Sequence, residues 1–284
     1  MIDICILTKP RFKEDIDYSI EWYLLHSEDF NLRNITVYCN FHYEYSYPDD
    51  RVIIKRALPY ENFHRQKEIY LEYLQSGIPQ EGDYIIFCDD DEFFYYDKNV
   101  LNMTLSQLLE KFNKKLYKVP EILMSTDSIQ DDRWKSPNLM RFCQYRRNDK
   151  TGQVKSIIKY SKKYTYDFTT VMNESHLPLH TPSINGKLQN SILYTKNKTK
   201  EITTYTDDTS YSLIEYDFPL RLYHYAIKTV SDWNYKIRRG SAASETPWYD
   251  KSLYKNIFYG NYKTKETVVY EDYLRRKEIM SKHN

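Results

Sequence analysis

The sequence has few of the residues from which metal knuckles, disulfide frameworks and phosphate loops are built. The 4 cysteines lie far apart and include no CxxC pair, so neither a zinc knuckle nor a disulfide framework is indicated. The 6 glycines form neither GxGxxG nor a Walker loop. A nucleotide, if one binds, is therefore not held by a glycine-rich phosphate cradle.

The chain also lacks a charge bias and a long apolar run. Its 41 basic and 40 acidic residues nearly cancel, so overall charge gives no argument for a nucleic-acid or bulk membrane partner, although a local basic patch stays open. No run approaches the length of a membrane span, and the short apolar stretch in "MIDICILTKPRF" has no basic region ahead of it. These absences favour a cytoplasmic protein, including one bound at the inner face of a membrane.

Aromatic residues, by contrast, are abundant. The 284 residues are 41% apolar, enough for one large domain or a domain with an appendage, and 30 of them are tyrosine. Tyrosines suit either stacking on sugars and bases or the packing of a core with polar edges. We assign most of them to packing.

Hydrophobic periodicity predicts an α/β sheet in the first hundred residues. Apolar runs and alternation predict strands at 4–8, 34–39, 51–57 and 84–88, and helical spacing predicts helices at 14–26 and 62–79. The order β-α-β-β-α-β implies a largely parallel sheet.

Further elements follow the acidic residues at 89–92. Thr104 and Gln107 form a capping-box pattern that predicts a helix. Strands are expected at 119–124, 138–145 and 154–160, loops that could include one hairpin at 185–212, and helices at 231–240 and 270–280. We expect one domain with a helical tail, divided as 1–228 and 229–284.

The stretch "YIIFCDDDEFF" places four acids directly behind a strand that is expected to be covered on both faces. In open α/β sheets ligands collect at the carboxyl ends of strands. Alternation along an extended chain would send Asp89 and Asp91 to one side and Asp90 to the other. Two such carboxylates suit Mg²⁺ or Mn²⁺ with a nucleotide diphosphate completing the shell, whereas the alternative is a solvated acidic turn.

The same stretch resembles the "DW-hydrophobic-D-x-DEF" signature of bacterial glycosyltransferases related to families 2 and 92, which have a GT-A fold. Other stretches agree in the same order, among them "EWYLLH", "RQKEIYLEYL", "MSTDSIQDDRW", "VKSIIK", "HTP" and "YHYAIKTVSDWNYKIRRG". The resemblance implies a Rossmann-like, mostly parallel sheet flanked by helices, with a helical extension at the C-terminus. It also implies a metal-dependent, inverting transfer of a sugar from a nucleotide sugar, with a UDP-sugar as the first expectation, to a glycan or lipid-linked hydroxyl.

The resemblance assigns site residues. Asp89, Asp91 and His224 would hold the metal, although a histidine between tyrosines can equally be a packed core residue. Donor binding would fall to Asp89 and to residues of four other stretches: Thr8, Lys9, Arg11, Gln66, Lys228, Lys236 and Arg239. A surface loop and a solvated basic face are the alternatives for these.

The chemistry would need a base close to the acceptor hydroxyl. Asp127 is the first choice, and Asp131 or Asp132 could take the role. Glu92 could orient the acceptor or brace its loop by accepting backbone N–H bonds, and His180 would shape the acceptor wall.

Two other classes of protein stay open. One is a non-catalytic carbohydrate-binding protein that keeps the fold. The other is a metal-dependent nucleotidyltransferase or phosphodiesterase, because acids at a strand end also serve two-metal chemistry. A nucleic-acid acceptor is not excluded.

Overall fold

The computed structural model describes twelve segments of the chain. They are residues 1–8, 13–39, 44–57, 66–125, 145–147, 154–168, 182–187, 192–195, 202–205, 219–225, 262–265 and 267–282.

The strands, in chain order, are β1 (Ile2–Thr8), β2 (Leu32–Cys39), β3 (Val52–Arg56), β4 (Tyr84–Asp89), β5 (Glu92–Tyr96), β6 (Leu116–Ser125), β7 (Tyr145–Arg147), β8 (Val154–Lys159), β9 (Tyr166–Asp167), β10 (Ser183–Ile184), β11 (Ile192–Thr195), β12 (Ile202–Tyr205), β13 (Leu220–His224) and β14 (Tyr262–Lys265). The helices are α1 (Lys13–Leu25), α2 (Ser27–Phe30), α3 (Gln66–Gln75), α4 (Lys98–Leu101), α5 (Leu105–Phe112) and α9 (Val268–Ser281).

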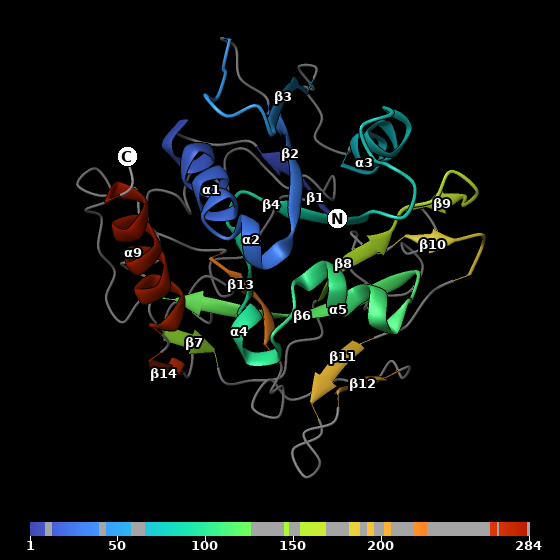
Figure 1. Cartoon of the computed structure of the whole chain (residues 1–284). Coiled ribbons are helices and arrows are strands. Elements are labelled where there is room, and N and C mark those ends of the chain that lie inside the picture. The colour runs from blue at the N-terminus through green and yellow to red at the C-terminus, as the bar shows by residue number, and fades with distance from the viewer. Residues whose placement is uncertain are drawn as a thin grey trace, which may run out of the picture.

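A mixed sheet runs through the molecule in the order β12-β11-β6-β8-β4-β1-β2-β3 (Figure 1). Strands β3, β2, β1 and β4 are mutually parallel, and β8 is antiparallel to both of its neighbours, β4 and β6. Strand β13 joins this sheet beside β6 and pairs on its other side with β5. The carboxyl ends of β1 and β4 therefore lie next to each other, with Leu7 opposite Asp89.

Alternation along the central strands divides the core between the two faces of the sheet. Ile4, Ile6 and Ile86 pack with α1, α5 and α9, whereas Cys5 and Phe87 pack with α3 on the other face. Figure 1 shows α1 and α2 together and α3 apart from them. Burial on both faces explains why β1 and β4 are almost entirely apolar.

Local signals fix several helix ends. The predicted capping box of α5 is confirmed, because the Thr104 side chain accepts the Gln107 N–H while the Gln107 side chain accepts the Thr104 N–H. Helices α2, α4 and α5 end at Asn31, Asn102 and Asn113, each in the left-handed conformation. Asparagine tolerates that conformation best after glycine, which this chain uses sparingly.

Helix α9 packs against α1 through aromatic and charged contacts. The rings of Tyr273 and Tyr18 lie 5.0 Å apart, and Tyr18 in turn contacts Phe93 at the start of β5. The predicted C-terminal helix is thus confirmed, and the region after residue 228 also supplies β14, which pairs with β7. None of the helices in the described segments has the length and apolar character needed to cross a bilayer.

Most of the predicted elements within the described segments are confirmed. The strands at 4–8, 34–39, 51–57, 84–88, 119–124 and 154–160 correspond to β1, β2, β3, β4, β6 and β8, and the hairpin within 185–212 corresponds to β11 and β12. The helix at 231–240 and most of the strand at 138–145 lie outside the described residues. Two strands that the sequence did not predict, β5 and β13, carry the site.

Candidate metal and donor site

The four acids lie at a tight turn that joins β4 to β5, two strands that pair with different neighbours. Asp89 ends β4, Asp90 and Asp91 make the turn, and Glu92 begins β5. Helix α1 contacts the start of β5, where the Tyr23 hydroxyl donates to the Glu92 carbonyl at 3.0 Å. The Trp22 indole N–H donates to the carbonyl of Phe94 at 2.9 Å. The stretch "EWYLLH" therefore acts by fastening β5 to the helix.

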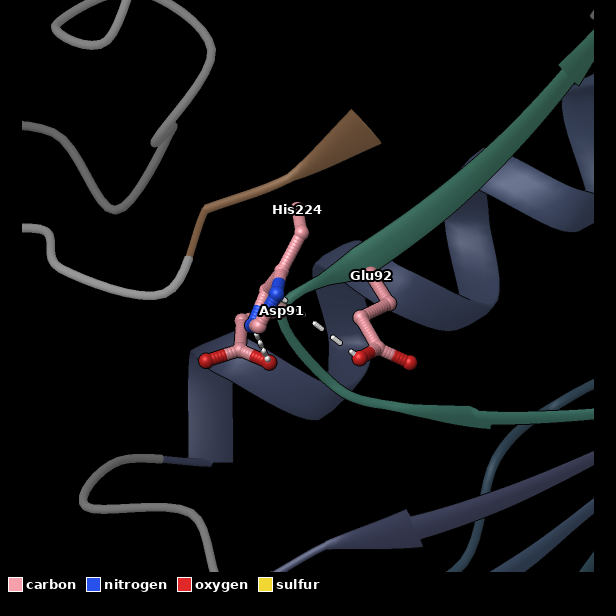
Figure 2. A group of neighbouring side chains, drawn as sticks. All are labelled: Asp91, Glu92 and His224. Carbon is pink, nitrogen blue, oxygen red and sulfur yellow. Dashed lines mark ion pairs between the residues drawn. The ribbon is translucent and has the colours of Figure 1, made fainter. Parts of the chain in front are cut away.

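Strand β13 brings His224 to the same place. It runs antiparallel to β5, with His224 opposite Glu92, and the Tyr225 N–H donates to the Asp91 carbonyl at 2.8 Å. Figure 2 shows the imidazole of His224 reaching from β13 to the turn that carries Asp91, with Glu92 beside it. Pairing between strands far apart in sequence thus places an imidazole beside the acidic turn.

Asp91, Glu92 and His224 form a group that could hold a metal ion. One ligand atom from each lies within 4.8 Å of the others. The His224 Nε2 atom is 3.6 Å from Asp91 Oδ1, which is too long for a hydrogen bond. Two ligands of one Mg²⁺, each about 2.0–2.1 Å from it, can be at most about 4.2 Å apart, so this pair fits one ion.

Glu121, from β6, holds the other ring nitrogen. Its carboxylate makes a short contact with His224 Nδ1, and the residue is almost fully buried. Burial raises the pKa of Glu121, but the charge and hydrogen bond of His224 bring it below its usual value. Burial lowers the pKa of His224, but Glu121 and Asp91 raise it well above its usual value. A carboxylate on Nδ1 leaves Nε2 directed at Asp91, as in many metal-binding histidines.

Glu92 is engaged on both oxygens. Its Oε1 lies 2.8 Å from the Lys155 ammonium, and its Oε2 accepts the Asp89 N–H at 3.0 Å. Burial raises the pKa of Glu92 to about 7, and the ammonium of Lys155 opposes this. Of the two roles expected for Glu92, the geometry favours bracing the loop. A role in catalysis stays a prediction.

The alternation argument for Asp89 and Asp91 is wrong, because it holds only for an extended chain and the strand ends at Asp89. The Asp89 side chain is 34% exposed and lies 3.3 Å from the Lys155 ammonium, whereas the Asp91 side chain is 6% exposed and faces His224. The structure brings Asp91 and His224 together and places Asp89 on the other side of Glu92, beside Lys155.

Thr8 and Gln66 belong to neighbouring elements. Thr8 ends β1, one register position beyond the Leu7–Asp89 pair, and its buried hydroxyl has no hydrogen-bond partner among the described residues. Gln66 begins α3 and donates to the Tyr70 hydroxyl at 2.9 Å. Tyr70 packs on Phe87 of β4, so Gln66 lies on the α3 face of the sheet. Thr8 is the better placed of the two for a ligand at the strand ends.

The remaining predicted residues lie outside the described segments. They are Lys9, Arg11, Asp127, Asp131, Asp132, His180, Lys228, Lys236 and Arg239. Their roles stay predictions.

Glu121 and Lys155 were not predicted as site residues from the sequence. Both are charged residues that follow apolar or proline residues within strands, in "VPEILM" and "VKSIIK", and both are nearly fully buried. A charge in the middle of a buried strand is costly unless it is paired, so this pattern was an available signal for a paired site.

Comparisons with known proteins identify no family. No protein-family model and no curated protein matches the sequence. Among solved structures, TarS of S. aureus (residues 1–349) aligns over 100% of this chain and 73% of its own, with 8% identity and a TM-score of 0.34. The bifunctional IspDF of Campylobacter jejuni aligns over 56% of this chain, with 13% identity and a TM-score of 0.29, and this chain covers 41% of IspDF. Likeness at these levels establishes neither family nor function.

Proposed function

We propose that the protein is a metal-dependent glycosyltransferase with a GT-A fold, moving a sugar from a nucleotide sugar to a hydroxyl acceptor. The observation that carries this proposal is the meeting of Asp91 and His224 at the carboxyl end of β4. That position in a mostly parallel sheet, with helices on both faces, is where α/β enzymes bind nucleotides. The ordered resemblance of the sequence to glycosyltransferases supports the same conclusion.

The donor set suits a hard divalent ion that also binds a diphosphate. Asp91 supplies a carboxylate oxygen and His224 supplies Nε2, while Glu121 keeps the imidazole in position. Two protein ligands leave most of the shell of Mg²⁺ or Mn²⁺ to phosphate oxygens and water. When bound, such an ion neutralises the charge that develops on the diphosphate leaving group.

Several side chains would prepare the site for the donor. The Thr8 hydroxyl at the end of β1, which has no hydrogen-bond partner within the described segments, would be offered to a ligand at the adjoining strand ends. Glu92 braces the turn from within by its hydrogen bond from the Asp89 amide. Asp127 remains the proposed base for the acceptor hydroxyl, with Asp131 as its neighbour.

The direct test measures hydrolysis or transfer of a nucleotide sugar with and without Mn²⁺. Asp91→Ala should lower the metal-dependent rate at least about 100-fold, since even residues behind metal ligands typically cost 10–100-fold. Asp50→Ala, an exposed acid outside the site, is the matched control and should keep the wild-type rate. Unchanged metal-dependent turnover in Asp91→Ala would reject the proposal.

A thermal-shift assay identifies which nucleotide sugar the protein binds as donor. UDP-, GDP-, CMP- and dTDP-sugars are tested with Mn²⁺, and the bound donor should raise the melting temperature, because a ligand that binds the folded state stabilises it. A UDP-sugar is expected to give the largest shift. Glycan affinity without any nucleotide affinity would instead support a non-catalytic carbohydrate-binding protein.

A further inference from the structure

A lysine from the neighbouring strand contacts the acidic turn. Lys155 lies on β8, two residues before Ile157, which pairs with Ile86 of β4. Because β8 runs antiparallel to β4, Lys155 lies beyond this pair, towards the carboxyl end of β4 where the acids are. Its side chain is only 4% exposed.

The ammonium of Lys155 joins the two acids that flank the turn. It is 2.8 Å from Glu92 Oε1 and 3.3 Å from Asp89 Oδ2. A lysine is cationic at neutral pH, and the two carboxylates in contact with Lys155 stabilise that charge. A compact ammonium with three donors can hold two carboxylates at once, which would otherwise repel each other.

The contacts with Lys155 and His224 divide the carboxylates of the turn into two groups. Asp89 and Glu92 face Lys155, whereas Asp91 faces His224 at 3.6 Å. Glu92 also approaches His224, but on Nδ1 at 3.9 Å, the nitrogen that Glu121 contacts. One pair of facing ligand atoms, Asp91 Oδ1 and His224 Nε2, is thus directed at a single position.

We propose that Lys155 is a fixed cation in the place of a second metal ion, so that the site binds one divalent ion, at Asp91 and His224. This inference rests on the proposed metal dependence and sharpens it. Lys155 is then a positioning residue, which keeps Asp89 and Glu92 from acting as ligands. Within the part of the chain that the structure describes, a second ion about 3.5–4 Å from the first, as in two-metal chemistry, would draw on these carboxylates.

The test counts bound Mn²⁺ on metal-free protein by calorimetry and by the paramagnetic signal of free Mn²⁺. Wild type should bind one ion per chain. Lys155→Met should bind two, because Asp89 and Glu92 are released as ligands. Lys159→Met, the same substitution on the same strand with Glu110 as partner, is the matched control and should bind one.

A double variant covers the case in which Lys155→Met does not fold. Lys155→Met with Glu92→Gln removes both charges of the pair and should again bind one ion, with a dissociation constant near that of the wild type. Loss of Mn²⁺ binding in this variant would make Glu92 a ligand and overturn the inference.

The outcomes separate this inference from the proposed function. Two ions on the wild type, or one ion of unchanged affinity on a folded Lys155→Met, would overturn the role of Lys155 while leaving metal-dependent transfer intact. Absence of any Mn²⁺ binding by the wild type would overturn the metal dependence and this inference together.

Discussion

Two histidines, the buried His26 and the half-buried His224, show how similar groups serve different ends. Both imidazoles contact a carboxylate that comes from a distant part of the chain. His26 is fully buried, and its nitrogens lie 2.8 Å from the Trp22 carbonyl and 2.9 Å from Asp272. The His224 side chain is 18% exposed; its Nδ1 makes a short contact with Glu121, whereas its Nε2 lies 3.6 Å from Asp91.

The cluster around His26 is closed on itself. Asp272 of α9 also pairs with Arg276 at 2.7 Å. Arg276 in turn forms an ion pair with Asp29 and donates to the Leu25 carbonyl. Each charge there meets an opposite charge or a carbonyl. Such a cluster fastens α9 to α1 and α2, and its described charges are paired with one another.

The cluster around His224 is arranged differently. Glu121 secures Nδ1, but Nε2 and Asp91 face each other across a distance that no hydrogen bond spans. A histidine thus indicates a ligand when one nitrogen is held by a carboxylate and the other faces a second potential ligand. The variants and titrations that follow test this difference between the two clusters.

The largest loss of stability is expected when the closed cluster around His26 is broken. Arg276→Met leaves Asp29 and Asp272 without their shared guanidinium, and the free energy of unfolding should fall by about 3–5 kcal/mol, the usual cost of breaking a buried ion pair. Urea denaturation measures this free energy. Arg275→Met on the same helix is the control, because the Arg275 side chain is 58% exposed. Its free energy of unfolding should fall by less than about 1 kcal/mol. Mn²⁺ affinity should not change in either variant.

Removing the support of the open cluster should affect metal binding. Glu121→Gln leaves His224 free to turn, so the dissociation constant for Mn²⁺ should rise about 10–100-fold, as for other carboxylates behind metal-binding histidines. Calorimetry with Mn²⁺ measures the effect. Glu110→Gln, an exposed carboxylate on α5, should leave the constant unchanged. Equal constants in all three proteins would show that Glu121 does not position the imidazole.

The two histidines should respond to pH in opposite directions. Burial lowers the pKa of His26, against the hydrogen bond with Asp272, whereas that of His224 is raised by Glu121 and Asp91 despite burial. A lowered histidine pKa means that stability is lost as pH falls below about 6.5, whereas a raised pKa means that stability is lost as pH rises from about 6.5 through the raised value. The slope for each proton is at most about 1.4 kcal/mol per pH unit.

Proton NMR titration of the imidazoles in the metal-free protein checks this. His26→Gln and His224→Gln assign the two resonances, and His26 should titrate below 6.5 and His224 above it. A resonance of His224 that titrates below 6.5 would remove the difference between the clusters.

The smallest effect is expected at the exposed edge of α9. Lys277 pairs with Glu21 at 2.9 Å, but the lysine side chain is 54% exposed. Lys277→Met should lower the free energy of unfolding by no more than about 1 kcal/mol, because solvent screens such pairs. A loss as large as that of Arg276→Met would show that burial does not decide what these ion pairs contribute.

Local patterns were sufficient for much of the fold. Alternation and apolar runs predicted β1, β2 and β4, and the capping box of Thr104 and Gln107 predicted the start of α5. These features depend on neighbours within a few residues, so a single sequence reveals them. Strand β5 was not predicted, because the acids before it resemble the end of a segment rather than a two-residue turn between strands.

From the sequence alone it follows that acids stand at the end of a buried strand and that His224 comes much later in the chain. The contact of Asp91 with His224, and the contacts of Asp89 and Glu92 with Lys155, arise only when the sheet is assembled. The reason is that these contacts depend on the register between strands distant in sequence, β13 on β5 and β8 on β4. Register is set by the packing of the whole sheet, and a shift of one residue would turn each of these side chains to the opposite face.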